Sequence, residues 1–343
     1  MNDSAPEARP ARRNRLIVAA IGRCGLLALL AVLSPVQGYA AEAGIDVPMR
    51  RDRATSQQPL STQSSGGLLE ATEVVRREIG ILRSELGAND FPAQAESHQD
   101  RTPIHVYVKA LEVMSKVAAL QRRLGVPVGE VRSLPLSDVS ADEAMGAVQD
   151  ILDGIDAIKK QLVIDASVEV AATSDGPRML AVAYRNLADA SLLIDWLVGR
   201  ELTLQAVFQS LMAAVEDINL IATRVQVPLN GELPEVSDQR NLINVAQQAM
   251  RAAYKVANLQ TGLGMDASAV PTLTMVRVSP TEIHDLIGIL RAELVRIKGH
   301  LGINVPTDDV PAAGFGQDSA DLFAQMLLVV RHLDQLVVSA RSQ

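Results

Sequence analysis

The sequence predicts an all-α protein built as a tandem duplication of a four-helix unit, and three observations predict it. Of 343 residues, 48% are apolar and only 3% are aromatic, with Ala, Leu and Val dominant, a composition that favours helices over stacked aromatic platforms. Apolar residues recur with heptad spacing in segments of about 22 residues. The pattern of segment ends in the first half of the chain then repeats in the second half.

The helical segments are recognised by their periodicity and by their ends. Several end in a leucine followed by glycine, as at Leu124-Gly125 and Leu263-Gly264, which is typical of a left-handed C-terminal cap. The closing positions follow one another at steps of 38, 38 and 36, then 27, and again 38, 38 and 36. Eight helices are therefore expected, at about 68–86, 103–124, 141–162, 178–198, 204–225, 239–263, 280–301 and 319–338.

A single shift, the one that places Ser140 on Ser279, brings the two halves into correspondence. Ser140 with Glu143 falls on Ser279 with Glu282, and each pair has the spacing of a capping box at a helix start. Core positions correspond under the same shift: Ala144, Val148, Ile151, Ile155, Ile158 and Leu162 fall on Ile283, Ile287, Leu290, Leu294, Ile297 and Leu301.

The spacing of these core positions alternates between four and three residues, which is the heptad found where long helices interlock at about 20°. It predicts two up-and-down helical bundles, each of four helices. The alternative is a continuous α-solenoid of helical hairpins. The connectors, which contain several prolines, are longer than an up-and-down bundle needs.

The N-terminal region predicts export from the cytoplasm. Arginines precede an apolar stretch from Leu16 to Ser34, and small residues at Gly38 and Ala40 fit a cleavage site. Arg23 interrupts the apolar stretch, so no stable membrane span is expected after cleavage. The predicted organisation is a cleavable export signal at 1–40, a disordered linker at 41–66, copy 1 of the four-helix unit at 67–199 and copy 2 at 200–343.

Charge and cysteine content exclude several classes of function. The only cysteine, Cys24, lies within the signal, so the mature chain is expected to lack disulfides, thiolate catalysis and cysteine metal sites. Removing the net +3 of the signal from the total of −8 leaves the mature chain at about −11. Nucleic acid and anionic membrane surfaces are therefore not expected as partners.

The sequence predicts no catalytic or cofactor-binding residues. No nucleophile elbow, P-loop, dinucleotide fingerprint or zinc-helix motif is present. No histidine has the Glu-x-x-His spacing that a di-iron bundle requires, and solvated or capping roles are expected for all five: His98, His105, His284, His300 and His332. The candidate for a metal site is an oxygen-rich calcium cluster without EF-hand spacing, formed by Asp308, Asp309, Asp318 and Asp321.

Two polar positions recur in both halves. Lys116 and Lys255 lie beside the heptad seam, where a lysine usually extends its ammonium into water. Gln121 and Gln260 are expected to make a repeated polar contact inside each bundle.

We therefore expect a non-enzymatic periplasmic or secreted protein without a cofactor, which binds or scaffolds through protein–protein contacts. Its expected partner is another envelope protein, and a homo-oligomer remains open. The alternative is a carrier of a small apolar ligand held between helices.

Overall fold

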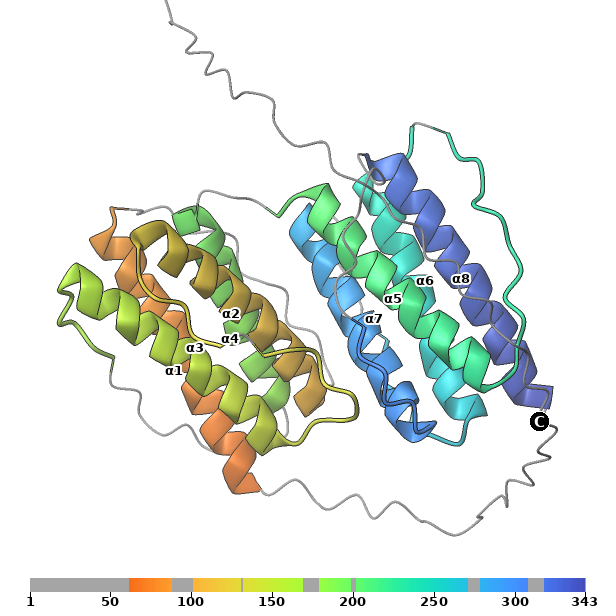
Figure 1. Cartoon of the computed structure of the whole chain (residues 1–343), viewed down its shortest axis with the longest axis horizontal. Helices are drawn as coiled ribbons and strands as arrows, with labels where there is room; N and C mark the ends of the chain where they lie inside the picture. Colours follow the sequence, from red (N-terminus) through yellow and green to blue (C-terminus); the bar gives the residue numbers. More distant parts are fainter. Residues whose placement is uncertain are drawn as a thin grey trace, which may run out of the picture. The chain divides into compact units, whose positions relative to one another are not determined.

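The computed structural model describes residues 62–87, 101–130, 132–168, 179–198, 202–237, 239–270, 278–307 and 318–342, and every structural statement below concerns these residues. The predicted signal at 1–40 and most of the predicted linker at 41–66 lie outside them. The described chain is all-helical, as predicted (Figure 1). Its elements are α1 (Thr62–Glu85), α2 (Pro103–Leu124), α3 (Ala141–Leu162), α4 (Met179–Val198), α5 (Leu204–Arg224), α6 (Leu242–Gly262), α7 (Pro280–His300) and α8 (Ser319–Ser342).

The observed helix ends follow the local signals in the sequence. Ser140 accepts from the backbone N–H of Glu143 at 3.2 Å, while the Glu143 carboxylate accepts from the Ser140 N–H at 2.8 Å. This is the predicted capping box of α3. At the C-terminus of α2, Gly125 adopts φ 70°, which glycine tolerates because it has no Cβ. The main difference is at α1, which begins at Thr62, earlier than predicted and inside the segment expected to be a linker.

The helices pack as two groups of four, which is the predicted bundle arrangement. In the first bundle, α1 and α2 each contact α3 and α4; in the second, α5 and α6 each contact α7 and α8. Helices α1 and α2 make no contact with each other, nor do α3 and α4. The first and second helices of each bundle therefore lie diagonally across it, as do the third and fourth, whereas the second and third lie side by side.

The direction of the helices differs from the up-and-down connectivity that we expected. Along α2 and α4, Glu112 contacts Ser191 and Lys116 contacts Asp195. Residue numbers rise together on both helices, so α2 and α4 are parallel. Figure 1 shows the axes of the four helices of each bundle running the same way. Contacts between other neighbouring helices show the same rising order of residue numbers. These contacts are Gly67–Met145 and Glu78–Lys159 between α1 and α3, Asp217–Lys298 and Arg224–Leu301 between α5 and α7, and Lys255–Asp334 and Gly262–Ala340 between α6 and α8.

Parallel neighbours explain the length of the connectors. A helix of 22 residues such as α2 is about 33 Å long, so a chain that returns to the starting end needs about ten extended residues. The described residues 125–130 and 132–140 do return along α2, since Ser133 accepts a hydrogen bond from Tyr107 near the start of that helix. The connector after α2 is long because it retraces the length of its bundle.

Parallel packing also brings like ends of helix dipoles together, which costs free energy unless charges offset it. Basic residues in the last turn face the partial negative charge of the C-termini: Arg83, Arg122, Arg123, Lys159, Lys160, Arg224, Lys298, His300 and Arg341. Acidic residues in the first turn complement the other end: Asp142, Glu143, Glu282 and Asp321.

Each bundle has its own apolar core, formed largely by the predicted heptad positions. Helix α7 is the exception, because it has two buried faces. Its heptad face packs in the second bundle, whereas Ile289, Ala292 and Val295 belong to the core of the first. The structure therefore places α7 against α2, and this contact joins the bundles.

Buried ion pairs occupy corresponding positions in the two bundles. Lys159 pairs with Glu78 at 2.7 Å, and at the positions that match them in the second half Lys298 pairs with Asp217 at 2.6 Å. These pairs support the duplication, which remains a prediction about the origin of the two units.

Among the described helices, α8 is long and apolar enough over Ser319–Arg341 to cross a membrane by length and composition, and 56% of that stretch is buried within the protein.

Candidate functional site

A cluster of buried and half-buried charged side chains lies where α2 meets α7. Helix α2 contributes Lys109, Glu112 and Lys116, whose three- and four-residue spacing places them on one face. Helix α7 contributes His284 and Asp285 from its first turns. The cluster therefore spans two helices that are far apart in the sequence.

The Lys109 ammonium lies between two carboxylates. Its Nζ donates to Glu112 Oε2 at 2.7 Å and also to Asp285 Oδ1. The side chain of Lys109 is only 2% exposed, so the charge depends on these partners for its stabilisation.

The second oxygen of Glu112 is also fully used. Glu112 Oε1 accepts from Ser191 Oγ at 2.5 Å and lies 3.0 Å from Lys116 Nζ. Lys116 in turn donates to Asp195 at 2.8 Å. The contacts thus form a continuous chain of alternating charge from Asp195 on α4 to Asp285 on α7.

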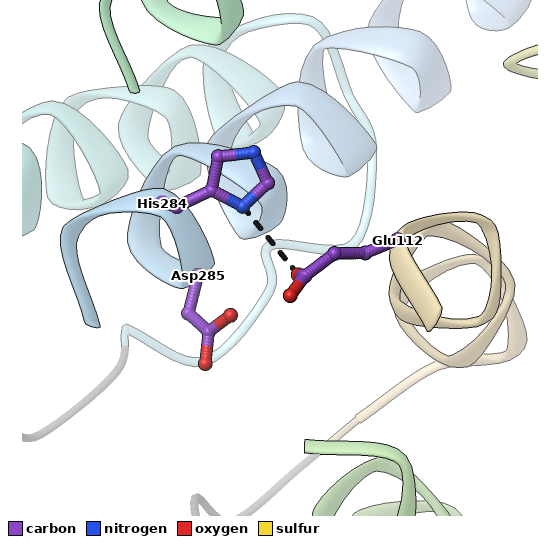
Figure 2. Close-up of side chains that lie close together, drawn as sticks. All are labelled: Glu112, His284 and Asp285. Atoms are coloured by element: carbon purple, nitrogen blue, oxygen red, sulfur yellow. Dashed lines mark ion pairs between the residues drawn. The ribbon is translucent and has the colours of Figure 1, made fainter. Parts of the chain in front are cut away.

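His284 completes the cluster from the side of α7. Figure 2 shows its Nδ1 pointing toward Glu112, and the Nδ1–Oε2 distance is 3.4 Å. One ligand atom from each of Glu112, His284 and Asp285 can be chosen so that all three lie within 4.8 Å of one another. Nitrogen and carboxylate ligands of this kind suit a divalent cation such as Zn²⁺.

The observed geometry nevertheless places another cation in that position. The Lys109 ammonium already lies between the carboxylates of Glu112 and Asp285. A metal ion would have to displace it and draw the three ligand atoms inward to bonds of about 2 Å. As they stand, these residues form a closed ion-pair network and do not fit a metal ion.

The pKa shifts of Glu112 and Lys109 favour their charged forms, whereas burial raises the pKa of Asp285 and Asp195. Burial raises the pKa of Glu112, but the ammonium groups of Lys109 and Lys116 outweigh it and hold that pKa well below its usual range. Burial lowers the pKa of Lys109, but Asp285 and Glu112 outweigh it and raise that pKa above its usual value. Burial also raises the pKa of the neighbouring Tyr184 hydroxyl to about 12.

A second polar contact joins the same two helices. His105 Nδ1 accepts from the backbone N–H of Thr102 at 3.1 Å, so the proton of the neutral ring is on Nε2, which lies 2.9 Å from Glu293 Oε1. Burial lowers the pKa of His105. Burial raises the pKa of Glu293, but His105 and Arg296 outweigh it and bring that pKa to about 2.

A cavity of about 390 Å³ lies beside these contacts. Its lining combines the charged groups of Lys109, Glu112 and Asp285 with apolar side chains such as Val108 and Ile289.

The predicted calcium cluster is only partly described. Asp308 and Asp309 lie outside the described residues. Asp318 acts at the start of α8, where its Oδ1 accepts from the N–H groups of Ala320 at 2.8 Å and Asp321 at 2.9 Å. This is the capping role that acidic residues commonly have at a helix N-terminus, and calcium binding stays a prediction.

The prediction for Lys116 is wrong. Its ammonium is not extended into water: Lys116 is 9% exposed and pairs with Asp195, because α4 places a carboxylate next to it. Lys255 makes the corresponding pair with Asp334, but its side chain is 30% exposed.

The predicted polar contacts of the two glutamines are confirmed. Gln121 donates to the backbone oxygen of Gly154 at 3.2 Å, and Gln260 donates to the carboxylate of Glu293 at 2.5 Å. The histidines are only partly as expected. His105 caps α2 and His300 is exposed, as expected, although His105 is also buried and lies next to Glu293. His332, at 8% exposed, is buried instead of solvated. His98 lies outside the described residues.

Sequence reasoning did not identify the charged cluster. The spacing of Lys109, Glu112 and Lys116 is visible in the sequence, but alternating charges on a helix usually mark a solvated face. Their partners Ser191 and Asp285 carry no motif. Comparison of the chain with protein-family models, with curated proteins and with solved structures finds no match.

Proposed function

We propose that this chain is a non-enzymatic binding or scaffolding protein of the periplasm, or secreted, that acts through contacts with another envelope protein. The observation that carries the proposal is the charge pairing between α2 and α7. General acid–base catalysis requires a pKa close to the working pH. The shifts of Lys109 and Glu112 move both groups away from neutrality.

The same cluster suits a scaffolding role. A buried ammonium between two carboxylates tolerates few other arrangements, because moving either helix leaves a charge without its partner. The contacts of Lys109 and His105 with α7 thus favour one orientation of the two bundles. A partner protein would then meet a rigid surface and lose little conformational entropy on binding.

The end of the first bundle offers a surface for such a partner. Because α1, α3 and α4 are parallel, their C-terminal ends bring three exposed apolar side chains to the same end of the bundle: Leu86 (42% exposed), Val163 (81%) and Trp196 (57%). Tryptophan is enriched among the residues that dominate the energetics of protein interfaces. Trp196 is the only tryptophan of the chain.

The test is crosslinking and co-purification of the full chain from native envelopes, followed by binding measurements with the purified partner. Trp196→Ala should weaken binding by about 2 kcal/mol or more if Trp196 is an anchor. Tyr254→Ala is the matched control, since Tyr254 is 55% exposed on α6 of the second bundle. A clean monomer without any crosslinked partner would count against the proposal, and equal effects of both substitutions would exclude this surface.

The carrier of a small apolar ligand remains the second candidate from the sequence. It would need an apolar cavity. Among the described residues, the cavity at α2 and α7 has a charged lining, so no specific observation favours this candidate.

A further inference from the structure

Three of the large apolar side chains that are exposed in the described structure lie at one end of the first bundle: Leu86, Val163 and Trp196. They stand at the C-terminal ends of the parallel helices α1, α3 and α4. Helix α1 packs against both α3 and α4, and neighbouring helix axes lie about 8–10 Å apart. The three side chains therefore border a single area, called the apolar end below.

The backbone of Val163 indicates that this area is kept for contact. Val163 is left-handed, with φ 57°, and its side chain is 81% exposed. A β-branched residue is unfavourable in this conformation, which glycine adopts freely. Gly302 stands at the matching position of the second half, with φ 70°. An exposed valine gains little from packing within its own chain, and backbone strain of this kind is concentrated at functional sites.

The second bundle ends differently at the other two positions as well. Gln335 stands in place of Trp196; its Oε1 accepts from the N–H of Asn230 at 3.0 Å, and its Nε2 donates to the backbone oxygen of Asn230 at 2.7 Å. Val225 stands in place of Leu86 and is half-buried. The parallel bundle therefore does not require large exposed apolar side chains at these positions.

Cationic side chains flank the apolar end. Arg122 and Arg123 lie in the last turn of α2 and Lys160 in the last turn of α3, and all three are exposed. Arg123 donates to two backbone oxygens at the end of α4, at 3.0 and 2.8 Å, which joins the end of α2 to the side of Trp196. Two exposed carboxylates, Glu85 and Asp165, lie nearby. The three cations outnumber them, although the whole chain is acidic, with a net charge of −8.

The helix dipoles alone do not account for Arg122 and Lys160. A cation in the last turn does offset the partial negative charge of a helix C-terminus. At the matching positions of the second bundle, however, stand Thr261 and Gly299, and the helices of that bundle are parallel as well. The excess of cations at the first end thus has no counterpart in the rest of the fold.

We propose, resting on the function proposed above, that the apolar end binds a segment of the partner protein in which an aromatic or large aliphatic side chain is flanked by aspartate or glutamate. The apolar side chain of that segment packs against Trp196 and Val163, as in the buried centre of an interface. Its carboxylates pair with Arg122 and Lys160 at the rim, where complementary charges select the partner.

A protein segment fits this surface better than an anionic lipid bilayer does. The net charge of the whole chain, −8, opposes its approach to an extended surface of the same sign. A short segment responds only to the charges within a Debye length, about 8 Å at physiological salt, and within that range the cations of the apolar end are in excess.

The test is selection from a library of random peptides on the purified full chain. Enriched peptides should combine an apolar side chain with acidic neighbours. Trp196 is the only tryptophan, so its fluorescence reports binding at this surface: the emission should shift to shorter wavelength when a peptide covers the ring. The affinity should fall at least about threefold between about 0.05 and 0.5 M NaCl, because salt screens the rim charges.

Three outcomes of this selection would overturn the proposal. The first is enrichment of basic or uncharged peptides, or of none. The second is binding that leaves the emission of Trp196 unchanged. The third is binding of the chain to vesicles of phosphatidylcholine and phosphatidylglycerol, which would assign the surface to a lipid.

Variants test the two features separately. Arg122→Glu together with Lys160→Glu should weaken the binding of an enriched acidic peptide by about tenfold or more. Val163→Gly removes an apolar contact and relieves the backbone, so it should weaken binding by about threefold or more without loss of stability. Arg251→Glu together with Arg331→Glu is the matched control, because both arginines are exposed on the second bundle and the net charge changes equally. Unchanged affinity in either test variant, or an equal loss in the control, would overturn the assignment.

The same variants distinguish a failure of this inference from a failure of the proposed function. If the native partner loses affinity for Trp196→Ala but keeps it for the double charge reversal at Arg122 and Lys160, the acidic chemistry is wrong and the proposed function stands. If no partner can be crosslinked in native envelopes, the proposed function fails, and so does the inference that rests on it.

Discussion

The ion pair between Lys298 and Asp217 is the most deeply buried one described in the second bundle, and it allows a quantitative prediction. The two side chains are 1% and 0% exposed, and Nζ lies 2.6 Å from Oδ1. The same oxygen accepts a hydrogen bond from Thr307 at 2.7 Å. Asp217→Asn keeps the shape of the side chain and removes its charge, so the Lys298 ammonium remains buried without a counter-charge.

Removing one partner of a buried ion pair typically costs about 3–5 kcal/mol. We expect Asp217→Asn to lower the free energy of unfolding by about 3 kcal/mol, the lower end of this range, because the amide oxygen still accepts hydrogen bonds. This is a large share of the usual total of about 5–15 kcal/mol. Replacing both charges, with Asp217→Leu and Lys298→Met together, should bring the stability back to within about 1 kcal/mol of the unaltered protein.

The corresponding pair of the first bundle provides a matched comparison. Glu78 and Lys159 are each 9% exposed at the side chain, so water can partly solvate a charge left there. Glu78→Gln should cost only about 1–2 kcal/mol for this reason.

Urea denaturation followed by circular dichroism measures these differences, and hydrogen exchange of the α5 and α7 amides locates them in the second bundle. A cost below about 1 kcal/mol for Asp217→Asn would refute the reasoning from burial. So would a double variant as unstable as the single one, or equal costs at Asp217 and Glu78.

Three further predictions concern pH, the backbone and the charged cluster. Glu293 has a pKa of about 2, below its ordinary 4.5, so the ionised carboxylate contributes about 3 kcal/mol to the free energy of unfolding above pH 4.5, and this contribution is lost as the pH falls toward 2. Glu293→Gln should therefore flatten this part of the curve of unfolding free energy against pH. A curve parallel to that of the unaltered protein would contradict the assignment. Val163 has a left-handed backbone, with φ 57°, and is 81% exposed, so Val163→Gly should raise the free energy of unfolding by about 1 kcal/mol in urea denaturation. Gly302, at the corresponding position, has φ 70°, so Gly302→Val should lower it by a similar amount. Stabilities of both variants equal to that of the unaltered protein would show that neither position is strained. Lys109→Ala removes the ammonium between two carboxylates, so Zn²⁺ should raise the melting temperature of this variant but not that of the unaltered protein, and an equal response of both would show that Lys109 does not block the position.

The sequence alone determined most of the helix ends, though not the start of α1, and which side of most helices is buried. The capping box of Ser140 and Glu143 and the left-handed Gly125 are formed as predicted. Ala144, Val148 and Ile151 are fully buried at their heptad positions. These features were predictable because hydrogen bonds within a few residues and the period of the helix produce them.

Only the tertiary structure decided which helices are neighbours and in which direction they run. A heptad stripe shows that one face of a helix is buried, but it fits a parallel neighbour as well as an antiparallel one. The long connectors were visible in the sequence, yet their return along the bundle was not. The second buried face of α7, at Ile289 and Ala292, likewise depends on the presence of the other bundle.

The candidate site belongs entirely to this second class. Lys109 and Glu112 are neighbours on one helix and are visible in the sequence, whereas Asp285 lies 176 residues from Lys109. Their charges become buried only when α7 packs against α2. Short-range patterns in a sequence encode local hydrogen bonds and faces, but the pairing of distant charges is set by the free energy of packing of the whole chain. The sequence therefore predicts the helices of this protein, whereas its charged cluster forms only in the folded molecule.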